Sequence, residues 1–150
     1  MPLARLWTDE RGSASLEFVS AAMILLVPLV YLVLTMSALQ GGSLAVEGAA
    51  RHAARVFVEA DTPGEAEDAA TAAVAVALAD HGIDADRAEV SIRCSPDPAR
   101  CLDRRATVTV EVVVHVPLPL VPPALGVEAP FDVPVASSAT QRVSRFQDVP

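Results

Sequence analysis

The sequence contains no lysine and no asparagine, and aromatic residues make up only 4% of it. The absence of asparagine removes any acceptor for N-glycosylation. Arginine is the only strongly basic residue, and aspartate and glutamate outnumber it by 19 to 11, which gives a formal net charge of −8. Nucleic-acid binding needs a basic face, so this balance argues against a nucleic-acid partner. It also argues against a general electrostatic attraction to an anionic membrane surface.

Motifs for catalysis and for cofactors are missing as well. The sequence has no glycine-rich phosphate loop, no His-Glu-x-x-His motif and no nucleophile elbow. The acidic residues between positions 80 and 89 offer oxygen ligands, but their spacing does not fit an EF-hand loop and favours a solvated turn. We therefore expect a protein that is not an enzyme and holds no cofactor and no metal ion.

Apolar residues make up 52% of the 150-residue chain, and one uncharged block from Phe18 to Leu39 holds most of the excess. About 20 residues cross the hydrocarbon core of a bilayer, so this block predicts one transmembrane helix, which we place at residues 13–40. Pro28 lies in its middle and is expected to kink the helix or loosen one turn, which membrane helices tolerate.

The charges around the block give a weak orientation signal. Two arginines lie before it at positions 5–11, and two more lie further away behind it at positions 51–55. The terminal amine adds one positive charge to the first group and so favours an N-terminus in the cytoplasm. We therefore expect a single-pass protein of the cell membrane with this orientation. Residues 1–12 then form a cytoplasmic leader, and residues 41–150 form an extracytoplasmic domain. A small-x-small sequence at 43–45 leaves open a secretory cut after Ala45, although secretory apolar regions are normally shorter.

Gly12 and Glu17 border the apolar block on its N-terminal side. One interpretation is a simple helix start, in which Ser13 or Ser15 caps the helix and the Glu17 carboxylate complements the helix dipole. The second interpretation treats the same residues as a cleavage signal, because the spacing resembles the type IV prepilin signature. In that signature a hydrophilic leader ends in glycine and the fifth mature residue is glutamate.

The wider segment, Arg-Gly-Ser-Ala-Ser-Leu-Glu-Phe before an apolar run with a central proline, resembles the TadE-like family. These are pseudopilin-type proteins of the tight-adherence, or Flp-type pilus, secretion system. The resemblance implies a pilin-like fold and cleavage by a prepilin peptidase between Gly12 and Ser13. It further implies that Glu17 becomes the fifth mature residue. The implied partners are the membrane, the peptidase, other pilins or pseudopilins, and pilus-assembly membrane proteins.

The physical chemistry of Glu17 agrees with this interpretation. An unpaired carboxylate inside a bilayer costs roughly a few kcal/mol, so such groups normally have a partner. Cleavage after Gly12 would expose the ammonium group of Ser13, which lies about 6 Å from Glu17 along a helix. The partner is then the chain's own N-terminus or that of a neighbouring subunit.

Two helices are expected in the first half of the outer domain. The glycine pair at 41–42 predicts a flexible point, and apolar residues at helical spacing then continue the first helix from Val46 to Ala60. Thr62 to Glu65 forms a capping box that begins an alanine-rich second helix, which ends before Gly82.

The second half of the domain alternates with a period of two. Strands are predicted around residues 90–93, over residues 107–116 and within residues 134–145, which gives a three-stranded antiparallel sheet and an α+β fold. Cys94 and Cys101 flank the first strand connection, so we expect a disulfide between them in an extracytoplasmic domain. Two free thiols are the alternative, and a metal site lacks two further ligands.

Two functions remain open from the sequence. One is a TadE-like pseudopilin or minor pilin-type component in the assembly of a Flp-type pilus or a related secretion system. The other is an unprocessed single-pass protein whose outer domain binds an unknown partner in the cell envelope. A secreted domain released after Ala45 is a third, weaker possibility.

Replacing Gly12 by leucine is expected to block processing, because the peptidase must accept an extended chain that has no side chain at this position. Intact-mass measurement of the protein, expressed with its cognate peptidase, should show the leader retained in the Gly12→Leu variant and removed in the wild type. The same mature mass for both proteins would remove the cleavage hypothesis.

Overall fold

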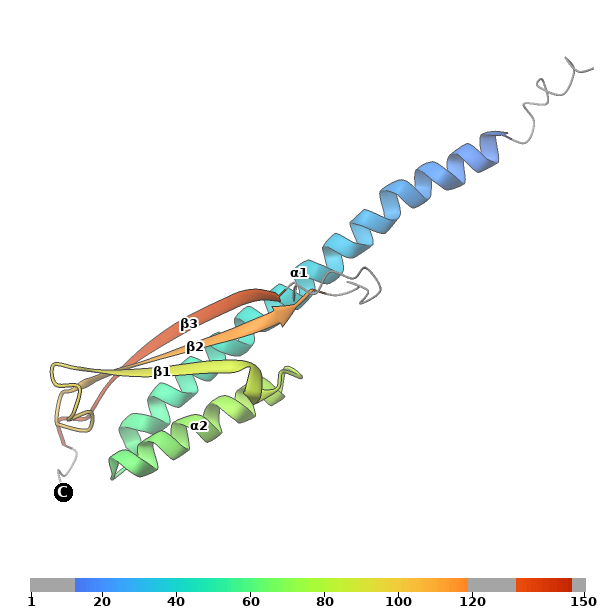
Figure 1. Cartoon of the computed structure of the whole chain (residues 1–150). Coiled ribbons are helices and arrows are strands. Elements are labelled where there is room, and N and C mark those ends of the chain that lie inside the picture. Colours follow the sequence, from blue (N-terminus) through green and yellow to red (C-terminus); the bar gives the residue numbers. More distant parts are fainter. Residues whose placement is uncertain (1–12, 119–131, 147–150) are drawn as a thin grey trace, which may run out of the picture.

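The computed structural model of the chain describes residues 13–118 and 132–146. It confirms the α+β class, with a long apolar N-terminal helix, a second helix and a small open antiparallel sheet (Figure 1). The elements are, in chain order, α1 (Ser13–Glu59), α2 (Pro63–Ala79), the short 3₁₀ helix η1 (Ala85–Arg87), β1 (Ala88–Ser95), β2 (Thr107–Pro117) and β3 (Asp132–Arg142).

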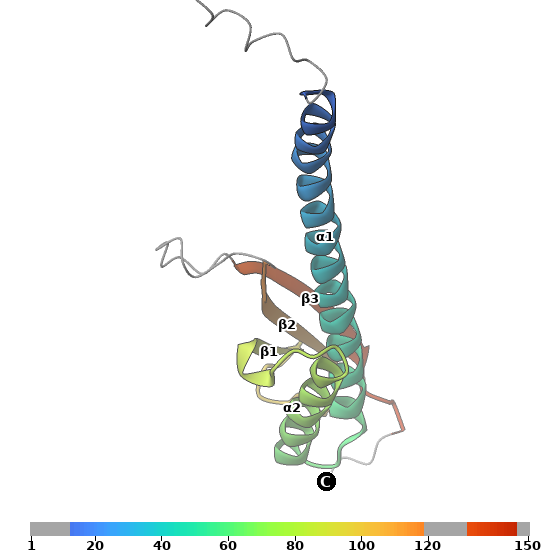
Figure 2. The same cartoon turned by 90° about the vertical axis from the view of Figure 1, so that its right-hand side faces the viewer.

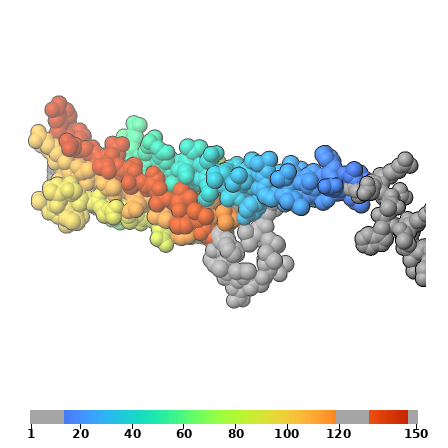
Figure 3. Space-filling view, turned by 90° about the horizontal axis from the view of Figure 1, so that it is seen from above, coloured from blue at the N-terminus to red at the C-terminus, as the bar shows by residue number. Residues whose placement is uncertain are grey.

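The two halves of helix α1, which is 47 residues long, differ in how much of their surface is buried. Its N-terminal half projects away from the rest of the molecule (Figures 1 and 3). It exposes apolar side chains, among them Leu25 with 74% of its surface exposed. This half is long and apolar enough to cross a membrane. Its C-terminal half lies against α2 and the sheet (Figure 2). The helix continues unbroken through Pro28.

The core of the domain lies where α1 meets α2 and the central strand. The apolar stripe predicted for α1 is buried, including Val46, Ala53 and Phe57. Alanines such as Ala66 and Ala70 supply the facing surface of α2, and their small side chains let the two helices pack closely. The Thr62 half of the capping box is confirmed, because its hydroxyl accepts a hydrogen bond from the backbone N–H of Glu65 at 3.3 Å. Gly82 follows α2 with a positive φ of 69°.

The sheet has the strand order β1-β2-β3, and both strand pairs are antiparallel. The central strand β2 alternates as predicted, with five buried valines on the side of the helices. The opposite face is polar, since Arg93 and Glu111 form an ion pair at 2.8 Å and the hydroxyls of Thr109 and Thr140 lie 3.0 Å apart. The helices therefore cover only one face of the sheet. The buried valines are Val108, Val110, Val112, Val114 and Val116.

The expected flexible point at residues 41–42 is wrong. Both glycines are helical, and Gly42 is buried where the end of β2 meets α1. A Cβ atom on Gly42 would lie only 2.5 Å from Cγ2 of Val116, with Val135 behind it at 3.9 Å. Glycine is therefore required here for the close approach of helix and strand rather than for a bend.

Replacing Gly42 by alanine is expected to lower the free energy of unfolding by about 1–2 kcal/mol, because the new methyl group must displace a stiff β-branched side chain. The matched control is Gly41→Ala, where a Cβ atom would meet nothing within 4 Å. That change should be neutral or stabilise the helix by up to about 1 kcal/mol. Thermal unfolding of the detergent-solubilised protein measures both effects. Equal unfolding midpoints for the two variants would contradict the tight contact at Gly42.

Candidate functional site

The predicted cleavage site lies at the edge of the described part of the chain. Gly12 is outside the described residues, and α1 begins at the next residue, Ser13. Glu17 therefore lies one helical turn after the residue that cleavage would make the N-terminus. This is the spacing of about 6 Å at which the ammonium group and the carboxylate can approach each other.

Glu17 is the only acidic residue in an otherwise apolar and exposed part of α1. Its neighbours Leu16 and Phe18 expose 72% and 75% of their surfaces. Among the described residues Glu17 has no ion-pair partner, while Ser20 donates a hydrogen bond to its backbone carbonyl at 3.3 Å. A carboxylate in this position needs a counter-charge from outside the described residues when lipid surrounds the helix.

Cys94 and Cys101 lie at disulfide distance, with their Cα atoms 5.2 Å apart. Cys94 belongs to β1 and Cys101 to the connection that leads to β2, and both pack against the core. Asp97 organises the loop between them, because it accepts hydrogen bonds from the backbone N–H of Ala99 and from the side chain of Arg100, each at 2.9 Å. These two contacts, the backbone one first, lower the pKa of the Asp97 carboxyl.

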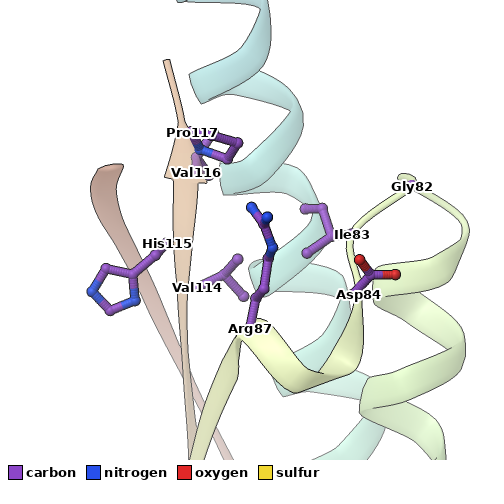
Figure 4. Close-up of a pocket in the computed structure, with 8 residues that line it drawn as sticks. All are labelled: Gly82, Ile83, Asp84, Arg87, Val114, His115, Val116 and Pro117. Atoms are coloured by element: carbon purple, nitrogen blue, oxygen red, sulfur yellow. The ribbon is translucent and has the colours of Figure 1, made fainter. Parts of the chain in front are cut away.

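A pocket of about 250 Å³ lies between the end of β2 and the turn after α2. Ile83, Val114 and Val116 supply apolar walls, and Arg87 rises from η1 into the space (Figure 4). His115 points to the opposite side of the strand (Figure 4). The sequence alone did not indicate this pocket, because it forms between segments that lie far apart in the chain. No local motif could have marked it.

The structure also bears on two other sequence hypotheses. Ala45 and Val46 are each only 1% exposed inside the unbroken α1, so a secretory cut between them would sever the core helix. In the described ranges, no three or more His, Cys, Asp or Glu side chains are arranged to hold a metal ion. The acidic residues between 80 and 89 lie on different elements, with Asp80 in the turn after α2, Asp86 in η1 and Glu89 in β1.

Comparison of the chain with protein-family models, with curated proteins and with solved structures finds no match. The functional argument therefore depends on the residues and on their geometry.

Replacing both cysteines by serine is expected to lower the free energy of unfolding by about 2.5 kcal/mol under oxidising conditions, because the unfolded chain loses a short closed loop. An alkylating reagent should label neither thiol in unreduced wild-type protein taken from the envelope, and mass spectrometry detects this directly. Labelling of Cys94 and Cys101 in that sample would contradict the disulfide. An unchanged free energy of unfolding in the double serine variant would contradict the contribution of the disulfide to stability.

Proposed function

We propose that the protein is a TadE-like pseudopilin or minor pilin-type component in the assembly of a Flp-type pilus or a related secretion system. In this proposal it spans the cell membrane once, with its N-terminus in the cytoplasm and its α+β domain outside. A prepilin peptidase removes residues 1–12. The observation that supports the proposal best is the position of Glu17, one turn after the start of α1 at Ser13 and within an exposed apolar surface.

In this proposal the residues before and after the cut have different tasks. The proposed cut after Gly12 leaves Ser13, the first described residue of α1, as the new N-terminus, so the whole described helix stays with the mature protein. After the cut, the new ammonium group of Ser13 lies within reach of Glu17. Pairing of the two charges offsets part of the cost of placing the carboxylate at the edge of the bilayer.

An ion pair between two subunits would have a further effect. If the ammonium group comes from a neighbouring subunit, its contact with Glu17 fixes the axial offset between two parallel α1 helices. Because α1 continues without interruption into the core of the outer domain, that offset also sets the positions of the two domains. A single charge pair in the membrane thereby defines the register of the assembly outside it.

Replacing Glu17 by glutamine keeps the size and helix propensity of the side chain but removes its charge. Membrane insertion should be normal or easier, and cleavage should continue. Recovery of other pilus components by co-purification is expected to fall about tenfold, because the neighbouring ammonium group loses its partner. Glu47→Gln is the matched control, since Glu47 lies on the same helix outside the span and pairs with Arg51.

The comparison is made at equal membrane levels of the three proteins. Equal recovery of partners by wild type and Glu17→Gln would mean that the carboxylate only favours the start of the helix. An equal loss for Glu17→Gln and Glu47→Gln would show a general effect of charge on α1 and would also contradict the assigned role.

A further inference from the structure

The pocket beside β2 lies at the end of the domain that faces the proposed membrane span. Val116, which lines the pocket, contacts α1 at Gly42. Gly42 follows Leu39, the last residue of the apolar block, by only three positions, or about 4.5 Å along the helix axis. The headgroup layer of a bilayer is about 5–7 Å thick on each side. The pocket therefore opens at the level of the lipid headgroups.

The turn after helix α2 lies at the same height along α1 as the end of β2. Helix α2 begins next to the end of α1 and runs back along it, so that the turn after its last residue, Ala79, returns toward the span (Figures 1 and 2). Gly82 and Ile83 in this turn form the other side of the pocket. Both walls thus lie next to the membrane whenever α1 spans it.

Arg87 gives this pocket a defined chemistry. Its guanidinium points toward the end of β2, where Val116 and Pro117 lie (Figure 4). Among the described residues it forms no ion pair, and the same holds for Arg142, whereas Arg51, Arg55, Arg93 and Arg100 each pair with a carboxylate. A guanidinium that is unpaired and close to apolar walls is suited to bind the phosphate of a phospholipid whose acyl chains extend into the bilayer.

The surrounding carboxylates indicate which phospholipid fits. Asp84 lines the same pocket, and Asp86 and Glu89 line the adjoining depression on the other side of Arg87. In a chain with a net charge of −8, these groups repel a headgroup that carries only negative charge. A zwitterionic headgroup meets the arginine with its phosphate and the aspartate with its ammonium group.

We propose that this pocket binds the headgroup of a zwitterionic phospholipid, with Arg87 on the phosphate and Asp84 near the ammonium group. The proposal depends on the membrane span proposed above but not on cleavage or on pilus assembly. The bound lipid would hold the domain upright against the leaflet and fix its rotation about α1.

The test is native mass spectrometry of the full chain released from nanodiscs that contain equal amounts of phosphatidylethanolamine and phosphatidylglycerol. The wild type should retain phosphatidylethanolamine in preference to phosphatidylglycerol. Arg87→Gln should retain about tenfold less of it, as expected for the loss of a charged hydrogen bond. Arg142→Gln, at the opposite end of the sheet, should behave like the wild type. Asp84→Asn should shift the preference toward phosphatidylglycerol.

Several results would overturn the proposal. Equal lipid retention by Arg87→Gln and the wild type would exclude the pocket while leaving the span intact. Preferential retention of phosphatidylglycerol by the wild type would contradict the zwitterionic ligand. Binding of soluble phosphoethanolamine at least as tightly as the lipid would identify a soluble phosphate ester as the ligand and contradict the lipid site. A chain that failed to enter nanodiscs would contradict the span itself, and with it the lipid site.

Discussion

The contact between α1 and the valines of β2 is the constraint on which the rest of the structure depends. Alanine and glycine on one side of the helix let the strand approach closely, and Gly42 marks the point where no Cβ atom fits. The helix that forms this contact is also the helix that presents an apolar surface over its N-terminal half. No break in the helix separates the two parts, so a displacement of the apolar half is transmitted directly to the domain.

The sequence predicted the fold well wherever local chemistry determines it. The box at Thr62 to Glu65 starts α2 because the hydroxyl satisfies a free N–H group, and the alternating valines form β2 because one face of the strand is buried. The prediction of a flexible point at 41–42 is wrong, because glycine is needed at position 42 to make room for Val116, more than seventy positions away along the chain. Sequence spacing carries no information about such a contact.

The candidate sites likewise fall into two groups, those that local sequence predicts and one that depends on segments far apart in the chain. Glu17 and the cysteine pair are predicted from spacing, since their chemistry depends on neighbours within a few residues, and the structure places the two cysteines at disulfide distance. The pocket with Arg87 was not found, because it requires the turn after α2 to meet the end of β2. Charge composition alone argued against electrostatic attachment to an anionic leaflet. That argument and a local zwitterionic headgroup site are compatible, because one unpaired guanidinium acts over a short distance whatever the net charge.

The identity of the mature N-terminus tests the central claim most directly. N-terminal sequencing of the protein purified from membranes of cells that contain the prepilin peptidase should begin at Ser13, followed by Ala14 and Ser15. A sequence that begins at Met1 or Pro2 would show an unprocessed single-pass protein and would contradict the pseudopilin proposal. A sequence that begins at Val46 would contradict both the proposal and the role of α1 as the continuous core of the domain.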